Sequence, residues 1–251
     1  MAERTAVEKA VLAALEREPG VNVHRRPVRV EYNVVERALV LEGEVDSIIA
    51  KRRAYECACR VDGVDGIMDR LRVRPSEPRG DGAIRASITQ SILDEPTLRD
   101  CALHAYHKGI METLRVPPGG ADVIGVMVTD GVVELTGHVG SLSHKRLVGA
   151  LSWWAPGCRD VLNEMDVRPP EADNDGELAD ALRLVLEKDP LIPHADDLGI
   201  GVRRGTVTLT GIVTTGEEQR QVEYDAWYLV GVRDVVNRLE VRRGNGRHGR
   251  L

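Results

Sequence analysis

The sequence has few aromatic residues, with no Phe, three Trp and five Tyr among 251 residues. Hydrophobic cores must therefore be built from Val, Leu, Ile and Ala, and few rings remain to stack on nucleic-acid bases. The formal net charge is −6, and no third of the chain has the strong excess of Lys and Arg that binding to a phosphate backbone requires. The composition therefore argues against nucleic acid as a partner.

Long apolar segments and disulfide frameworks are absent too. No apolar run approaches the roughly 20 residues of a membrane span, and the first nine residues include four charged side chains, unlike a secretory signal. Cysteines without framework spacing are typical of free thiols in a reducing compartment. We therefore expect a cytoplasmic protein without a transmembrane segment. The four cysteines are Cys57, Cys59, Cys101 and Cys158.

One pattern occurs three times, in residues 38–73, 132–167 and 206–241, and the three copies align without a gap. In each copy a second glycine follows the first after 20 positions, and a Val follows 10 positions later. Two equal spacings in three copies indicate an internal repeat, which determines the architecture. The signature glycines are Gly43, Gly63, Gly137, Gly157, Gly211 and Gly231.

Within each copy the hydrophobic period changes at the same place. Alternating residues such as VVELTGHV at 132–139 predict a half-buried strand. A small polar residue, Ser47 or Ser141, then precedes apolar residues three and four positions apart, which predicts a capped helix. The second glycine favours the left-handed conformation that ends a helix, and a last alternating strand follows.

Another helix precedes each copy and ends at an acidic residue followed by proline, as at Pro96. The first strand of a hairpin comes next, most clearly before the tight-turn sequence Asp130-Gly131. A strand–helix–strand crossover makes the joined strands parallel. We therefore predict an α+β fold of three tandem αββαβ units, each a small three-stranded mixed sheet covered on one face by two helices.

Pro-rich and acidic linkers at 74–82 and 168–176 separate the units. The second copy has about 20 residues more than the third between its proline and its corner glycine, and we expect this insertion to form a surface helix. The expected domains are unit 1 at 1–75, unit 2 at 80–168 with a helical insertion at about 97–116, unit 3 at 175–242, and a basic tail at 243–251.

The patterns G-x-V-x-L-x-G-x-V, G-V-x-x-V and V-x-N-x-L-x-V resemble the BON domain, a small bacterial module named for osmotically induced and nodulation-related proteins. The third copy, 205–241, matches best, and the resemblance covers nearly the whole chain except the insertion and the tail. It implies a non-catalytic module that binds phospholipid or another hydrophobic ligand in a stress- or envelope-related role. A cytoplasmic relative senses potassium, so a protein-interaction or potassium-sensing adaptor is the alternative.

Two pairs of residues are candidates for contact with a ligand or partner. Trp153 and Trp154 are adjacent on a predicted helix and point about 100° apart, so at most one can lie fully in the core. The other packs against the inserted helix or anchors at a membrane interface. Arg25 and Arg26 belong to a basic run that could dock on anionic headgroups.

Residues that could carry chemistry are few. Cys101, His104 and His107 can bind a metal, but on the expected helix they share a face only loosely, so we expect no metal and no other cofactor. The chain contains no nucleophile elbow, phosphate loop or dinucleotide fingerprint. His138 follows the corner glycine, where the other copies have Glu and Ile, so the repeat requires no catalytic group there. We therefore predict a non-enzymatic protein with a phospholipid or protein partner.

Overall fold

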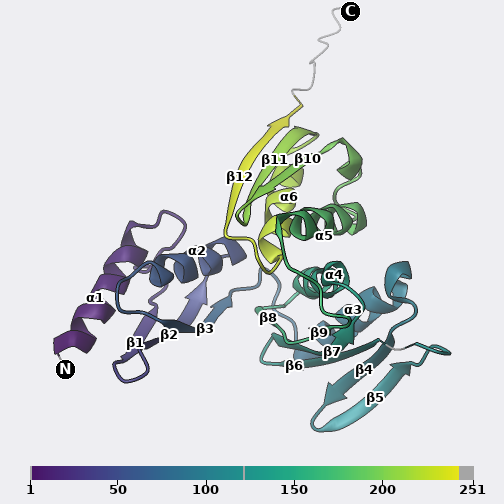
Figure 1. The fold of residues 1–251 in the computed structure, drawn as a ribbon, viewed down its shortest axis with the longest axis horizontal. Helices are drawn as coiled ribbons and strands as arrows, with labels where there is room; N and C mark the ends of the chain where they lie inside the picture. Colours follow the sequence, from purple (N-terminus) through teal and green to yellow (C-terminus); the bar gives the residue numbers. More distant parts are fainter. Residues whose placement is uncertain (1, 121, 243–251) are drawn as a thin grey trace, which may run out of the picture. The chain divides into compact units, whose positions relative to one another are not determined.

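The computed structural model describes residues 2–120 and 122–242 (Figure 1). The order helix, strand, strand, helix, strand recurs three times, which confirms the prediction of tandem αββαβ units. The chain divides into two compact units, Met1–Glu171 and Ala172–Leu251, so the first two copies belong to one unit and the third copy to the other.

The first copy forms a three-stranded sheet with two helices on one face (Figure 1). β1 pairs antiparallel and β3 pairs parallel with the central strand β2. Leu39 and Leu41 of β2 are fully buried beneath the helices. Ser47 accepts a hydrogen bond from the Ala50 N–H and caps α2 as predicted. The elements are α1 (Ala2–Arg17), β1 (Arg29–Asn33), β2 (Ala38–Val45), α2 (Ile48–Cys59) and β3 (Gly66–Val73).

The second copy has the same arrangement with a wider sheet, in the order β5-β4-β6-β7-β8, and β9 also pairs with β7. Ser141 caps α4 through the His144 N–H. The elements are α3 (Asp81–Asp94), η1 (Pro96–Leu98), β4 (Ala102–His107), β5 (Ile110–Arg115), β6 (Val123–Thr129), β7 (Val132–Val139), α4 (Leu142–Trp153), β8 (Asp160–Asn163) and β9 (Asp166–Val167).

The prediction of a helix at about 97–116 is wrong. These residues form the short 3-10 helix η1 and the hairpin of β4 and β5, which adds two strands to the sheet. Leu103 and Ala105 are buried on one face, which is the two-residue period of a strand. Lys108 and Gly109, with φ of 50° and 78°, form a tight turn with positive φ at both positions.

The third copy returns to three strands in the order β10-β11-β12. Asn174 caps α5 and Thr215 caps α6. Its core contains the fully buried Val207 and Leu209 and the indole of Trp227. The elements are α5 (Asp175–Lys188), η2 (Ala195–Asp197), β10 (Gly199–Arg203), β11 (Thr206–Val213), α6 (Gly216–Tyr228) and β12 (Asp234–Val241).

The corner glycine of each copy is required by the backbone. Gly137 of β7 has a φ of 105°, and a Cβ at this position would lie 2.1 Å from the carbonyl oxygen of Val123. Gly43 and Gly211 also have positive φ, 147° and 125°, and a Cβ there would lie 2.9 Å and 3.0 Å from a backbone carbonyl oxygen. The recurring glycine therefore serves the fold. The second glycine of each copy also has positive φ where a helix has ended: Gly63, Gly157 and Gly231.

The first two copies are joined through β3 and β8. The Val73 N–H donates a hydrogen bond of 2.8 Å to the carbonyl oxygen of Arg159, next to β8. The Arg159 guanidinium in turn lies 2.6 Å from a carboxylate oxygen of Glu44 in β2. The edges of the two sheets therefore meet at this point.

A buried group of charges lies beside this junction. Lys51 of α2 is 4% exposed, and its Nζ lies 2.9 Å from Asp69 and 3.2 Å from Asp160. Arg72 is a second cation on Asp160, which is only 2% exposed. Both copies contribute, so we name this group the inter-copy ion cluster: Lys51, Asp69, Arg72 and Asp160.

Candidate functional site

The helices leave one face of each sheet open, and the side chains on the open faces differ. In the first copy Arg29, Glu42 and Arg70 face one another across three strands, and Arg29 lies 3.8 Å from Glu42. In the third copy Gly201 and Thr208 are paired, which leaves a surface of small side chains. The first face also carries Met68, which is 52% exposed and paired with Val40.

The open face of the second copy is apolar in its middle. Tyr106 of β4 pairs with Met111 of β5 on one side and with Met127 of β6 on the other. Met111 is 53% and Met127 is 36% exposed. A Cβ at Gly125 would lie 3.0 Å from the Tyr106 ring, so the ring lies against this glycine. The three side chains form one row across the sheet.

A further apolar side chain lies at the tip of the added hairpin. Ile110, the first residue after the turn, is 72% exposed and pairs with His107, so it points to the opposite face of the hairpin from Met111. The tip therefore exposes a large apolar side chain on each of its faces, next to the exposed Lys108. We name the row and the tip together the hairpin surface: Tyr106, Ile110, Met111 and Met127.

The base of the hairpin is held firmly. The Arg115 guanidinium donates hydrogen bonds to the carbonyl oxygens of Leu98 at 2.6 Å and Cys101 at 3.0 Å. These bonds tie the end of β5 to η1 and to the residue before β4. Burial raises the pKa of the Cys101 thiol to about 11, so this cysteine stays protonated at neutral pH. The anchored base positions the exposed tip.

The three metal-capable residues of the insertion are separated by the strand. Cys101 is buried before β4, and His104 lies on the open face with its Nδ1 3.1 Å from the Thr113 hydroxyl. His107 is exposed at the turn and, three positions along the strand, points to the other face. Within residues 2–120 and 122–242 no three His, Cys, Asp or Glu side chains are placed to hold a metal ion together.

The two tryptophans occupy different environments. Trp153 is 9% exposed inside the last turn of α4, whereas Trp154 is the C-cap residue and is partly exposed. The inserted helix that we expected as their packing partner is replaced by the β4–β5 hairpin. Trp153 is therefore a core residue, and Trp154 has the more accessible ring of the two.

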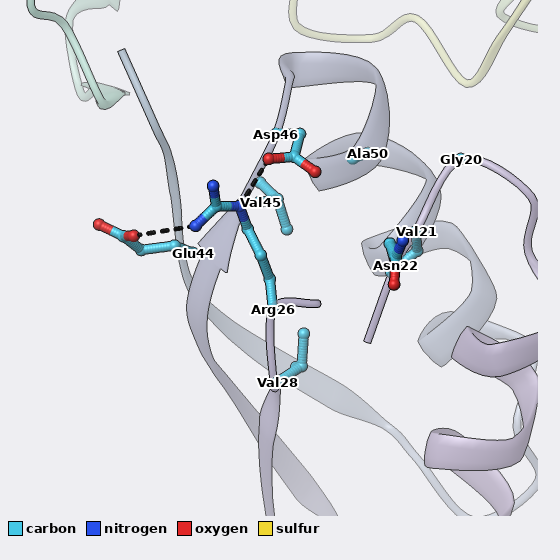
Figure 2. A pocket seen from close by; sticks show the side chains of 9 residues that line it. All are labelled: Gly20, Val21, Asn22, Arg26, Val28, Glu44, Val45, Asp46 and Ala50. Carbon is cyan, nitrogen blue, oxygen red and sulfur yellow. Dashed lines mark hydrogen bonds and ion pairs between the residues drawn. The ribbon is translucent and has the colours of Figure 1, made fainter. Parts of the chain in front are cut away.

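Arg26 lies in a small pocket of the first copy between two carboxylates (Figure 2). Its Nε is 2.5 Å from Asp46, and its Nη1 is 3.5 Å from Glu44. The hydrogen bond from Arg26 lowers the pKa of Asp46. The cavity measures about 10 Å³, which is room for about one water molecule. Arg26 is therefore occupied within the protein, while Arg25 is exposed. The basic tail at 243–251 lies outside the described residues.

The hairpin surface is not among the sites predicted from the sequence. Two features of the sequence could have predicted the hairpin. The alternation from Leu103 to His107 is typical of a strand, and the pair Lys108-Gly109 is typical of a tight turn. The exposure of Ile110 and Met111 follows only once β5 is known to lie at the edge of the sheet.

Among solved structures, the chain is similar to two structures of one protein. The C-terminal domain of CdsD, a structural protein of the type III secretion system of Chlamydia trachomatis, is 15% identical with a TM-score of 0.24, covering 94% of this chain and 96% of that chain. A second structure of CdsD is also 15% identical with a TM-score of 0.23, covering 93% of this chain and 91% of that chain. No curated protein sequence matches the chain.

No helix in the described part of the chain combines the length and apolar character needed to cross a membrane. The family model of the BON domain matches three segments, residues 4–75, 116–169 and 174–243. The second match begins after β5, so the added hairpin lies outside it. With three matched segments that together cover most of its length, the chain belongs to the BON domain family.

Proposed function

We propose that this protein is a non-catalytic binding module that attaches to phospholipid bilayers through the hairpin surface of its second copy. The observation that carries the proposal is the exposure of Ile110, at 72%, and Met111, at 53%, beside Lys108 at the tip of an anchored hairpin. Apolar side chains can enter the interface of a bilayer while a neighbouring cation meets anionic headgroups. Membership of the BON domain family supports a binding role.

The size of the hairpin surface predicts weak and reversible attachment. Complete burial of one large apolar side chain contributes about 1.5–3 kcal/mol, and Ile110 and Met111 are already partly covered. Two such residues and one nearby lysine, which adds about 1 kcal/mol at an anionic surface, provide only a moderate affinity. The attachment is therefore sensitive to salt and to the fraction of anionic lipid.

Vesicle flotation of the full chain tests the proposal. Wild-type protein should float with phosphatidylglycerol vesicles at low salt, and the variant Ile110→Ser/Met111→Ser should remain at the bottom. Val35→Ser is the matched control, because Val35 is 93% exposed in the β1–β2 turn of the first copy. Flotation of the double variant at the wild-type level would refute attachment through the hairpin surface.

A protein-interaction adaptor is a second candidate function, and the position of β5 favours it. β5 is at the edge of the sheet and is paired only with β4. A free edge offers backbone N–H and C=O groups to an extended peptide from a partner. Such pairing uses the backbone, so Ile110→Ser/Met111→Ser would retain a strand-adding partner while losing vesicles. The same variant therefore separates the two functions.

A further inference from the structure

A groove of about 650 Å³ lies at the junction of the first and second copies. Its walls are the segment that links the two copies, the β6–β7 turn and the loop before β8. The volume is within the range of roughly 300–1,000 Å³ that is typical of small-molecule sites. We name it the linker groove, and its charged lining residues are Glu44, Arg74, Arg79, Asp81, Asp130 and Arg159.

Two of the three carboxylates in the linker groove are bound by the protein itself. Glu44 lies 2.6 Å from Arg159 on one oxygen and 3.5 Å from Arg26 on the other. Asp81, the first residue of α3, accepts hydrogen bonds from the backbone N–H groups of Asp130 at 3.1 Å and Gly131 at 2.9 Å. These carboxylates are therefore already satisfied and add little attraction for a cationic ligand.

The arginines of the linking segment have less engaged charges. Arg74 is exposed and its charge helps to lower the pKa of Asp46, but its guanidinium forms no hydrogen bond or ion pair with another described residue. Arg79 pairs with Glu77 at 3.0 Å, but both side chains are more than half exposed, and such pairs contribute little free energy. An anionic ligand can therefore recruit both guanidinium groups without breaking a buried interaction.

The backbone that carries these two arginines is restricted. Pro75 and Pro78 fix φ at two positions of the linking segment. A Cβ at Gly157 would lie 2.7 Å from the Cβ of Arg79, so this part of the segment packs directly on the glycine that follows α4. The groove is therefore lined by a stiff segment rather than by a free linker.

We propose that the linker groove binds a phosphate-bearing group and that Arg74 and Arg79 are its ligands. A guanidinium group matches the oxygens of a phosphate with paired N–H donors, which favours arginine at such sites. Two sources share this chemistry: the headgroup of an anionic phospholipid and a soluble phosphate ester.

The lipid source rests on the proposed function, and the topology is compatible with it. β4 and β6 are parallel neighbours, so the turn at Lys108-Gly109 and the turn at Asp130-Gly131 are at the same end of the second sheet. The first turn carries the exposed tip of the hairpin, and the second turn is a wall of the linker groove. A bilayer in contact with Ile110 therefore meets the end of the sheet at which the groove lies.

The test uses the full chain, two soluble probes and vesicles of two compositions. Calorimetric titration with inorganic phosphate and with glycerol 3-phosphate measures soluble binding, and flotation compares phosphatidylglycerol with phosphatidylcholine. The variant Arg74→Ala/Arg79→Ala should bind the recognised probe about tenfold more weakly or worse, because it loses charge-assisted hydrogen bonds. Arg70→Ala, a change of an exposed arginine on β3, is the matched control and should bind as wild type.

The outcomes separate the source of the phosphate from the proposed function. If Arg74→Ala/Arg79→Ala loses binding to the soluble probes, the natural ligand is a soluble phosphate ester. If it loses binding only to phosphatidylglycerol vesicles, the ligand is a lipid headgroup. If Arg74→Ala/Arg79→Ala binds every probe as wild type, or if wild type binds none, the proposal is overturned. If only Ile110→Ser/Met111→Ser loses vesicles, the proposed function stands without the groove. Melting curves would show that the variants, changed only at exposed positions, remain folded.

Discussion

The first and third copies meet the same structural requirement with different chemical groups. In the third copy Gln219 of α6 donates a hydrogen bond of 2.6 Å to the carbonyl oxygen of Leu239 in β12. In the first copy the equivalent Lys51 of α2 donates a hydrogen bond of 2.7 Å to the carbonyl oxygen of Leu71 in β3. The first and third copies therefore both have a side-chain donor at this position of the helix, and the donor is charged in one copy and neutral in the other.

The strand residue beside this donor changes in the same way. Asn237 of the third copy donates to the carbonyl oxygen of Gln219 at 3.2 Å, whereas the first copy has Asp69, which accepts from Lys51. The charged version is completed by Asp160 of the second copy. The charges of the first copy therefore belong to the junction between two copies and not to the fold of either copy.

Burial of the inter-copy ion cluster has a cost in free energy, because its charged groups lose their contact with water. Burial raises the pKa of Asp160 despite its two cationic partners, so desolvation outweighs their attraction. A buried ion pair contributes little net stability, but removal of one partner leaves an uncompensated charge. The inter-copy ion cluster therefore sets how the first two copies join, at a cost that the neutral third copy avoids.

Asp160→Ala should have the largest effect. It leaves Lys51 and Arg72 without a shared carboxylate in a buried site, and we expect the free energy of unfolding of the first compact unit to fall by about 3–5 kcal/mol. The matched control is Asp234→Ala, because Asp234 has the equivalent place in the third copy but is exposed, and this change should cost less than about 1 kcal/mol. Urea denaturation with hydrogen exchange at β3 and β11 measures both.

A variant without the buried charges tests whether the fold needs them. The triple variant Lys51→Gln/Asp69→Asn/Asp160→Asn gives the first copy the amides of the third copy and also neutralises Asp160 of the second copy. Three buried charges disappear together and only the partly exposed Arg72 keeps its charge, so we expect stability within about 1 kcal/mol of wild type and well above that of Asp160→Ala. Equal losses in the triple variant and in Asp160→Ala would show that the charges are needed for the fold itself.

Substitution of the corner glycine should destabilise the first and third copies by similar amounts. A Cβ at Gly43 would lie 2.9 Å from the Pro27 carbonyl oxygen, and a Cβ at Gly211 would lie 3.0 Å from that of Asp197. Both glycines have positive φ, so Gly43→Ala and Gly211→Ala should each cost about 1–3 kcal/mol. Urea denaturation compares them, and a loss confined to one copy would contradict a shared structural requirement.

The repeated features could be predicted from the sequence because they are local. The paired glycines, the caps at Ser47 and Ser141 and the turn at Asp130-Gly131 each depend on a few neighbouring residues, and the structure has all of them. The hairpin at β4 and β5 was mistaken for a helix because its alternation is short and its Lys-Gly turn is a weaker signal than Asn-Gly or Asp-Gly.

The sites depend on residues that are distant in the sequence. Arg26 is occupied because Asp46 lies beside it, and Lys51 reaches Asp160 only because β3 meets β8. The exposure of Met111 depends on which strand is at the edge of the sheet. Periodicity shows which residues share a face, but it does not show which face another copy covers.

The smallest predicted effect concerns the turns of the first and third copies in acid. In the third copy Asp175 accepts hydrogen bonds from the backbone N–H groups of Gly205 at 2.9 Å and Arg204 at 2.6 Å, and these bonds lower its pKa. In the first copy the amide oxygen of Asn33 holds the turn through Val35 at 3.0 Å and a neighbouring N–H. Of these two turns, the third-copy turn is therefore the one whose backbone N–H groups are held by a carboxylate.

The lowered pKa of Asp175 determines the range of pH in which this residue stabilises the folded state. Its contribution to stability is complete above the pKa of an unfolded Asp, about 3.9, and is lost as the pH falls through the lower pKa of the folded state. Hydrogen exchange at Gly205 should therefore accelerate below about pH 4 relative to exchange at Val35, after correction for intrinsic rates. In Asp175→Asn this difference should no longer depend on pH. A pH dependence that persists in Asp175→Asn would assign it to another carboxylate, because the amide at position 175 cannot titrate, although its single oxygen can keep only one of the two hydrogen bonds.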